Sequence, residues 1–191
     1  EGQKPGAPRA LIIAPTRELA LQIEKDAKAL ARFAQLNVAS VVGGMDYQKQ
    51  RDSLSKKIDI LVATPGRLLD FHQKRDIALS ETEVLVLDEA DRMLSMGFIP
   101  DVKRIVQQTP KSRQSLLFSA TMSQGVSQLA RNMLRDPIRV DVSPKQPTVK
   151  KIDQRVIMVE KPDKLEVLQT LLHDESLSRA IVFTRTKHGA N

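Results

Sequence analysis

The chain has 191 residues, 41% of them apolar and only 3% aromatic, which is enough for one ordinary domain with an aliphatic core and part of another. It has no cysteine, which excludes disulfides and thiolate metal sites and fits a reducing compartment, so we expect a cytoplasmic protein. No apolar run approaches the ~20 residues that cross a membrane, and 30 lysines and arginines against 23 acids give a net charge of +7, which favours a polyanionic partner without proving one.

The chain begins with EGQKPGAPRA, a polar stretch with glycine and two prolines that predicts a loop. It does not start with methionine, so we expect it to be part of a longer protein. From residue 10 onward, strand and helix patterns alternate. Short apolar runs predict buried strands at 10–14, 38–42, 58–63, 84–88, 115–119 and 138–142.

Helical patterns fill the intervals between these strands. The stretch 17–33 has apolar residues at spacings of three and four, which places them on one helical face. The other predicted helices cover 46–55, 65–74, the region from the fourth strand to about residue 108 with an interruption near Gly97 and Pro100, and 126–134.

Repeated strand–helix–strand units predict an α/β fold, a doubly wound parallel sheet with helices on both faces. Ligands of such sheets gather at the carboxyl ends of the strands. Pro15, Thr64, Asp88 and Ser119 all fall at or just beyond predicted strand ends. We therefore expect the functional residues to share one edge of the sheet.

The alternation breaks at SPKQPTVKK, residues 143–151, where two prolines and three lysines without an apolar period predict a linker. Beyond it, QRVIMVE, KLEVLQTLL and RAIVFT predict a strand, a helix and a strand. One such unit is too small to bury a core of its own. We therefore expect a first domain over 1–142 and the beginning of a second domain over 152–191.

Residues 84–91, VLVLDEAD, run from four aliphatic residues directly into three acids. Carboxylates this close repel one another unless a cation offsets them. An acid pair after a buried parallel strand is the Walker B arrangement, in which Asp88 holds Mg²⁺ through water and Glu89 orients a water and accepts its proton. The alternative is a solvated strand end, with Asp88 capping the helix that follows.

Two strand-to-helix junctions, PTR at 15–17 and TPGR at 64–67, repeat one design. In each, a threonine can cap a helix while backbone N–H groups stay free for an anion. Each junction alone could be a capped helix with a solvated arginine, but two at one sheet edge of a basic chain favour a surface for a phosphate backbone. Gly44 would let that backbone approach closely. The candidate contacts are Pro15, Thr16, Arg17, Gly44, Thr64, Gly66 and Arg67.

Taken together, these strings and their order resemble the DEAD-box helicases over essentially the whole chain. The matching stretches are APTRELA at 14–20 (motif Ia), Gly43-Gly44, QKQR at 48–51 (QxxR), TPGR at 64–67 (motif Ib), DEAD at 88–91 (motif II), SAT at 119–121 (motif III) and VFTRTK at 182–187 (the start of motif IV). The stretch RTKHGAN is similar to bacterial RNA helicases of this family.

The resemblance implies two RecA-like domains, ATP and Mg²⁺ at Asp88 and Glu89, and RNA as the partner of a monomer. It also implies that Ser119 and Thr121 bind Asp91, although SAT alone could be a simple helix N-cap. Gln48 and Arg51 would support the RNA surface. Because few aromatic side chains are available for stacking, we expect binding through phosphate and sugar, independent of base sequence.

An ATPase of this class needs a phosphate-binding loop of the GxxxxGK[ST] kind, and the sequence contains none. The family places that loop before motif Ia and its arginine-rich motif beyond residue 191. We therefore expect the 191-residue chain alone to hydrolyse ATP negligibly. Two alternatives stay open: a non-catalytic module that binds nucleic acid or protein, and a DNA-directed helicase of superfamily 2.

Overall fold

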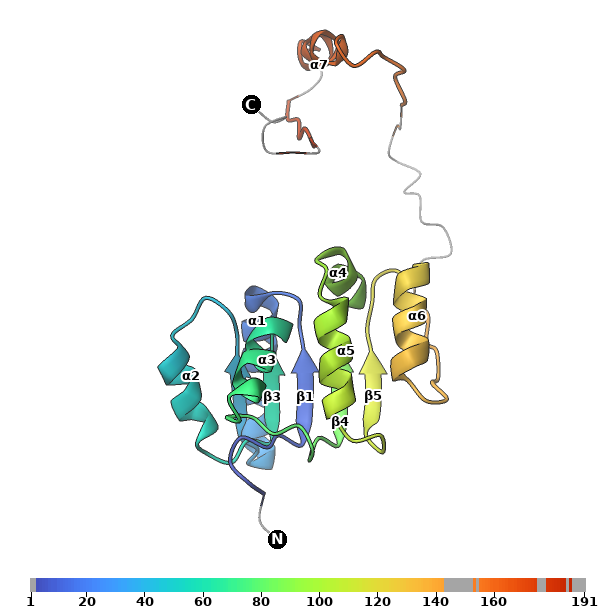
Figure 1. The fold of residues 1–191 in the computed structure, drawn as a ribbon. Helices are drawn as coiled ribbons and strands as arrows, with labels where there is room; N and C mark the ends of the chain where they lie inside the picture. The colour runs from blue at the N-terminus through green and yellow to red at the C-terminus, as the bar shows by residue number, and fades with distance from the viewer. Residues whose placement is uncertain (1–2, 143–152, 154, 175–177, 185, 187–191) are drawn as a thin grey trace. The chain divides into compact units, whose positions relative to one another are not determined.

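Five parallel strands form the sheet of the first part of the chain (Figure 1). Their order across the sheet is β2 (Val38–Val41), β3 (Ile60–Ala63), β1 (Ala10–Ile13), β4 (Val84–Leu87) and β5 (Gln114–Leu117). The computed structural model describes residues 3–142, 153, 155–174, 178–184 and 186. By their internal contacts two units are distinguished, Glu1–Arg139 and Val140–Asn191.

The strands are held in a common register. Ile13, the last residue of β1, pairs with Ala63 of β3 and with Leu87 of β4, and Leu87 pairs with Leu117 of β5. The carboxyl ends of all strands therefore lie level, at the upper edge of the sheet in Figure 1. This confirms the predicted parallel α/β sheet and five of its six strands.

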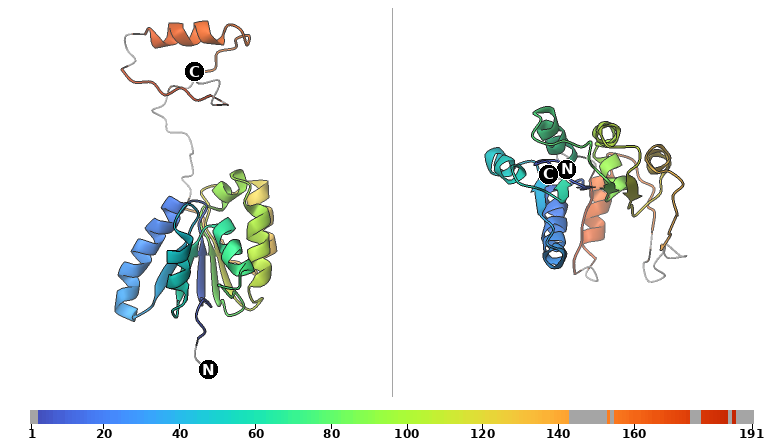
Figure 2. Two further views of the ribbon diagram at one scale, coloured as in Figure 1. Left: turned by 60° about the vertical axis from the view of Figure 1, so that its left-hand side comes forward. Right: turned by 90° about the horizontal axis from the view of Figure 1, so that it is seen from below.

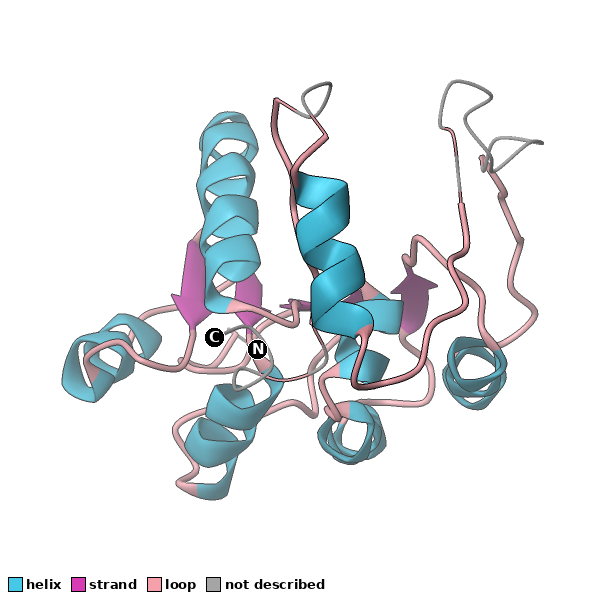
Figure 3. Ribbon diagram, turned by 90° about the horizontal axis from the view of Figure 1, so that it is seen from above, coloured by secondary structure: helices cyan, strands magenta, loops and turns pink. Residues whose placement is uncertain are grey.

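Helices cover both faces of the sheet because the strand side chains are apolar on both faces. Helix α1 (Arg17–Ala34) packs on one face over β2 and β3, while α3 (Pro65–Gln73) and α5 (Ile99–Gln108) lie on the other (Figures 2 and 3). The α1 face buries Ala14, Ala20, Val42 and Val62. The opposite face holds the larger core, built from aliphatic side chains around Phe71. The predicted aliphatic core is thus confirmed.

Three short helices complete the first unit: α2 (Tyr47–Leu54), α4 (Ala90–Ser95) and α6 (Gln124–Met133). Helix α4 ends at Ser95, and Gly97, which follows the cap residue Met96, has a left-handed φ of 77°. The N–H of Gly97 donates to the Leu94 carbonyl and that of Phe98 to the Met93 carbonyl, which is a Schellman end. This end separates α4 from α5, so the interruption predicted near Gly97 is confirmed.

Three predicted strands are wrong wherever the structure describes their residues. Residues 138–142, 155–160 and 179–184 are irregular, and Ile138, Val140, Met158 and Phe183 are 80–92% exposed. A strand persists only when neighbouring backbone satisfies its N–H and C=O groups. Within the described residues these segments have no strand partner, so their apolar pattern alone does not make them strands.

In the second unit, the predicted helix is confirmed as α7 (Lys164–Leu172), which buries none of its residues. The predicted linker 143–151 lies outside the described residues, and the predicted domain limits stay a prediction. Across the part of the chain that the structure describes, no helix is long and apolar enough to span a bilayer.

Candidate functional site

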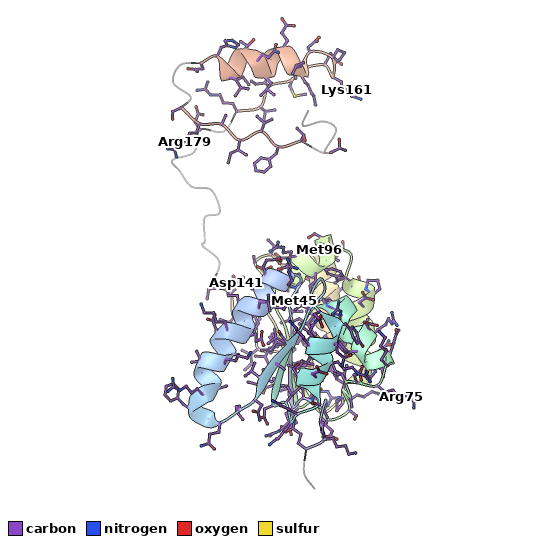
Figure 4. The ribbon with its side chains drawn as sticks, turned by 90° about the vertical axis from the view of Figure 1, so that its left-hand side faces the viewer. Met45, Arg75, Met96, Asp141, Lys161 and Arg179 are labelled. Atoms are coloured by element: carbon purple, nitrogen blue, oxygen red, sulfur yellow. The ribbon has the colours of Figure 1, made fainter. Side chains whose placement is uncertain are left out.

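The sequence-predicted residues come together at one edge of the first unit. Because every strand runs in the same direction, the residues after β1, β2, β3, β4 and β5 meet there. Across this edge they are ordered Gly43-Gly44, Thr64, Thr16, Asp88 and Ser119. Met45 and Met96, which lie close in sequence to Gly44 and to the DEAD turn, mark this end in Figure 4.

Asp88 and Glu89 form a tight turn after β4. The Asp88 N–H continues the sheet by donating to the Ile13 carbonyl at 3.0 Å, and Asp88 Oδ1 accepts from the Glu89 N–H at 2.9 Å. This bond joins adjacent residues, so Asp88 does not cap helix α4, and its other carboxylate oxygen makes no hydrogen bond to the described residues. Asp88 as a residue is half-buried, and this oxygen is not engaged by another described group.

Glu89 has an unusual backbone conformation. Its φ of 50° and ψ of 52° place it in the left-handed region, which for a non-glycine residue costs about 1–3 kcal/mol. Its carboxylate Oε2 accepts from Arg92 Nη1 at 3.1 Å. Such strain is found preferentially at functional sites, and here it directs a carboxylate out of the strand end.

Asp91 is tied to the SAT segment of the neighbouring strand end. Its Oδ2 accepts from both the N–H and the hydroxyl of Thr121, at 2.9 and 2.8 Å. Ser119 takes a different role from the expected one: its hydroxyl accepts from the Asp91 N–H at 3.2 Å and donates to the Thr121 carbonyl at 2.7 Å. The turn after β4 is thereby fixed to the segment after β5.

The pKa of Asp91 reflects these contacts. Desolvation, the largest single influence, raises the pKa, but the hydrogen bonds that the carboxylate accepts from Thr121 and from the Arg92 N–H, together with the nearby Ser119 hydroxyl, outweigh it. The net effect is a pKa below the ordinary value of an aspartate. Asp91 is therefore held in its charged form.

An open hollow of about 330 Å³ adjoins this turn, lined by Glu89, Asp91, Arg92, Ser95 and Ala120. Among the described residues, no cluster of three or more His, Cys, Asp or Glu side chains is arranged to hold a metal ion. Asp88 with its open oxygen nevertheless suits Mg²⁺, which is commonly bound by one or two carboxylates together with waters and substrate phosphates.

The predicted phosphate surface is a set of three loops that hold one another. Arg17 Nη1 donates to the Gly44 carbonyl at 3.4 Å, and Arg67 Nη1 donates to the Met45 carbonyl at 3.3 Å. The Gly43 N–H donates to the Thr64 hydroxyl at 3.3 Å. Both guanidinium groups thus donate to carbonyls of the loop after β2, and Arg17 also donates to Glu18 Oε1 through Nε and Nη2, at 3.3 and 3.2 Å.

Gly44 is required by this arrangement. Its φ is 73°, and a Cβ built there would come within 2.9 Å of Arg17 Nη1. The space that glycine leaves is filled by the arginine, a reason that the sequence alone did not suggest. Gly66 differs, since a Cβ there would meet no atom within 4 Å.

The remaining predicted contacts are Pro15, Thr16 and Thr64. Pro15 is buried, so its side chain supports the junction without facing solvent. The Thr16 hydroxyl caps α1 by accepting from the Leu19 N–H at 3.3 Å. Thr64 precedes Pro65 at the start of α3 and makes no side-chain cap, which leaves its hydroxyl with the loop after β2.

Sequence reasoning missed Gln50. Gln50 is buried, its Oε1 accepts from the Val42 N–H at 2.6 Å, and its Nε2 donates to the carbonyls of Met45 and Asp46. It therefore holds the loop after β2. Gln48, the predicted support residue, donates to Asp52 on its own helix and has no other side-chain hydrogen bond to the described residues. A polar residue in the helical position that faces β2 was the signal that could have identified Gln50.

Tyr47, for which the sequence indicates only packing, packs as expected and also makes polar contacts. Its ring stacks on Phe71 at 4.3 Å between centroids, and Arg67 Cζ lies 5.5 Å from the Tyr47 centroid. Arg51 Nε and the Tyr47 hydroxyl both donate to Asp76, at 2.9 and 3.3 Å. Arg51 thus reaches Arg67 through Asp76 and Tyr47.

Comparison with known proteins agrees with this geometry. The family model described as DEAD/DEAH box helicase matches residues 2–129. The chain therefore belongs to the DEAD/DEAH box helicase family, and the predicted RecA-like fold is confirmed.

Among individual proteins, the chain is similar to the ATP-dependent RNA helicase RhlB of Pseudomonas putida, with 50% identity over 185 residues, 95% of this chain and 46% of that protein. RhlB of a Shewanella species is 44% identical over 98% of this chain and 43% of its own length. The predicted likeness to bacterial RNA helicases is thus confirmed, and the chain spans less than half the length of these relatives.

Solved structures give the same result. The yeast DEAD-box splicing factor Prp28 superposes with a TM-score of 0.64 and 38% identity, covering 67% of this chain and 31% of that chain. A hypothetical ATP-dependent RNA helicase from Sulfolobus tokodaii has the same TM-score and 40% identity, covering 67% and 38%.

Proposed function

We propose that the chain is the part of an ATP-dependent RNA helicase that carries the catalytic carboxylates and part of the RNA surface. The strongest support is the position of these residues at the ends of neighbouring parallel strands. Asp88 and Glu89 follow β4, Thr16 follows β1 and Thr64 follows β3, and these strands are parallel neighbours. The printed names of the relatives, ATP-dependent RNA helicase, point to the same activity.

On the nucleotide side, Asp88 would hold Mg²⁺ through water with its second carboxylate oxygen. When bound, the ion would supply positive charge that offsets the charge developing on the phosphates during transfer. Glu89 orients the attacking water and accepts its proton. Asp91, fixed by Thr121 and Ser119, keeps the turn that carries Glu89 in place.

On the RNA side, Arg17 and Arg67 exchange carbonyls of the loop after β2, and in Arg17 also the Glu18 carboxylate, for phosphate oxygens. Arginine can bind phosphate through two parallel N–H···O bonds, which adds strength and geometric specificity and favours the exchange. The described edge offers guanidinium, hydroxyl and backbone N–H groups, which bind phosphate and sugar. Binding is therefore independent of base sequence. The cysteine-free composition agrees with a cytoplasmic protein, and we propose a monomer.

The test is ATP hydrolysis by the full-length protein, measured as phosphate release without nucleic acid, with RNA and with single-stranded DNA. Glu89→Gln should lower RNA-stimulated turnover by about 10²-fold or more, the usual contribution of a general base. The exposed Asp26→Asn on α1 is the matched control and should leave turnover unchanged. The 191-residue chain, which lacks a GK[ST] loop, should release almost no phosphate.

The outcomes separate the alternatives. Equal stimulation by RNA and DNA would favour a DNA-directed helicase. Nucleic-acid binding that ignores nucleotide, with no turnover in the unaltered protein, would identify a non-catalytic module. Unchanged turnover in Glu89→Gln would show that Glu89 is not the general base.

A further inference from the structure

We propose that Lys74 and the ring of Tyr47 extend the phosphate surface along helix α3, so that a bound RNA strand continues past Arg67 and away from the sheet edge. The inference rests on the proposed function, because it adds contacts to the same RNA surface. The side chains of Arg67, Tyr47, Asp70 and Lys74 are together called the α3 strip. The strip begins at the loop after β2, where Arg67 Nη1 donates to the Met45 carbonyl.

Helix α3 places three members of the strip on one of its sides. Asp70 and Lys74 follow Arg67 at intervals of three and seven residues, a spacing that aligns side chains along a helix. Arg67 lies in the first turn and Lys74 is the residue that ends the helix, so about 10 Å of helix axis separates them. A single strand that binds Arg67 through one phosphate can therefore bring a later phosphate to Lys74.

The ring of Tyr47, from helix α2, contacts both cations of the strip. Arg67 Cζ lies 5.5 Å from the ring centroid and Lys74 Nζ lies 4.1 Å from it. Both distances are within the ~6 Å over which the negative face of an aromatic ring attracts a cation. One ring thus holds two positive charges near each other, although they would repel in its absence.

Tyr47 is itself fixed by the end of α3. Its ring stacks on the buried ring of Phe71, with 4.3 Å between centroids, and its hydroxyl donates to Asp76 Oδ2 at 3.3 Å. The N–H of Asp76 donates to the Phe71 carbonyl at 3.0 Å, and Arg51 Nε donates to Asp76 Oδ1 at 2.9 Å. The nearby Asp76 charge is therefore compensated by Arg51, and the ring is a rigid support for the two cations.

Lys74 can bind a phosphate while it keeps its present contacts. Its Nζ pairs with Asp70 Oδ1 at 3.1 Å, and 55% of the lysine side chain is exposed. An ammonium group has three N–H donors, so the carboxylate and the ring do not exhaust them. Arg67 has no acidic partner among the described residues. The strip therefore carries more positive than negative charge, which is complementary to a phosphate backbone.

The test is fluorescence anisotropy of the 191-residue chain with labelled oligouridines of two lengths. The short RNA is the shortest one that the chain binds, and the long RNA extends it by several nucleotides at each end. On the long RNA, Lys74→Gln should reduce the slope of log affinity against log salt by ~0.7, the share of one phosphate contact on a single strand. On the short RNA, Lys74→Gln should leave the slope unchanged.

Lys28→Gln on α1 is the matched control. Lys28 also pairs with an acid four residues away, Glu24, at 2.7 Å, and 57% of its side chain is exposed. Helix α1 covers the other face of the sheet, and in Figure 4 it lies on the opposite side of the first unit from Arg75, the neighbour of Lys74 in sequence. Lys28→Gln should leave the slope unchanged on both RNAs.

Variants of Tyr47 test the ring separately. Tyr47→Leu removes the support of both cations and should weaken binding of the long RNA by about twofold to fivefold. Tyr47→Phe keeps the ring and should restore the affinity of the unaltered chain. Because the chain has one tyrosine and no tryptophan, its emission reports on Tyr47 alone and should change as the long RNA saturates the unaltered chain. Constant emission would show that the strand does not reach the ring.

Failure of the α3 strip and failure of the RNA surface give different results. If Arg67→Ala leaves the slope on the short RNA unchanged, the proposed RNA surface itself is wrong. If Arg67→Ala lowers that slope while Lys74→Gln behaves like Lys28→Gln on the long RNA, the surface stands and its extension along α3 is overturned. A slope that falls equally on both RNAs in Lys74→Gln also overturns the extension, because the lysine would then act on no additional phosphate.

Discussion

Asp91 and Thr121 hold two neighbouring strand ends together through a single carboxylate oxygen, which accepts from both the N–H and the hydroxyl of Thr121. The residues are 30 positions apart and follow β4 and β5. Because the acceptor is charged, each bond is stronger than a neutral one. Any change that moves the segment after β5 is therefore passed to the turn that carries Glu89.

Thr121→Val should lower the free energy of unfolding by about 1 kcal/mol, because it removes the hydroxyl bond and keeps the N–H bond. Thr121→Ser keeps a hydroxyl and is the matched control, expected to stay close to the unaltered chain. Urea unfolding at neutral pH measures both. Equal loss in Val and Ser variants would show that the threonine methyl, not the hydroxyl, stabilises this segment.

The lowered pKa of Asp91 predicts a pH-dependent contribution to stability. Since its folded-state pKa is below the unfolded value of about 3.9, the contribution is complete above that pH and is lost as pH falls through the folded-state pKa. The difference in unfolding free energy between the unaltered chain and Asp91→Asn should therefore be constant from neutral pH to about 5 and shrink below about 4. Urea unfolding at a series of pH values measures this, and a difference that persists undiminished in acid would contradict it.

The sequence predicted that the candidate residues share one edge of the sheet, because that placement depends on topology alone. Once the strands are parallel, the residues after Ile13, Ala63, Leu87 and Leu117 must share an edge, whatever the loops between them do. The spacing of apolar residues along the chain also predicted the helices and the core. These features follow from patterns that repeat along the chain.

Contacts that depend on a single loop conformation could not be predicted in this way. Gly44 faces Arg17 only because its φ is positive, and Gln50 reaches Val42 only because that loop folds back. Residues 138–142 illustrate the opposite case. Their alternating pattern is correct for a strand, but pairing requires a neighbour that local pattern does not supply.

Gly44→Ala should destabilise the loop after β2 and weaken RNA binding. At the left-handed φ of 73° an alanine costs roughly 1–2 kcal/mol, and its Cβ, built 2.9 Å from Nη1, would also displace the flexible end of Arg17. Gly66→Ala is the control, because its Cβ meets open space and alanine favours the helix that begins there. Urea unfolding should show a loss for Gly44→Ala and no loss for Gly66→Ala. Equal stability of the two variants would contradict the account of Gly44.

The proposed phosphate contacts predict a measurable change in the salt dependence of RNA binding. Each arginine that binds one phosphate releases counterions, so Arg17→Ala and Arg67→Ala should each reduce the slope of log affinity against log salt by about one contact's worth, ~0.7 for a single strand. Arg32→Ala removes an exposed arginine in the last turn of α1, far along the helix from Arg17, and should leave the slope unchanged. Fluorescence anisotropy with labelled oligouridine at several salt concentrations gives all the slopes. A slope that falls equally in all three variants would mean that RNA senses only the net charge of the chain, and the paired loops at the sheet edge would then have no specific part in holding the backbone.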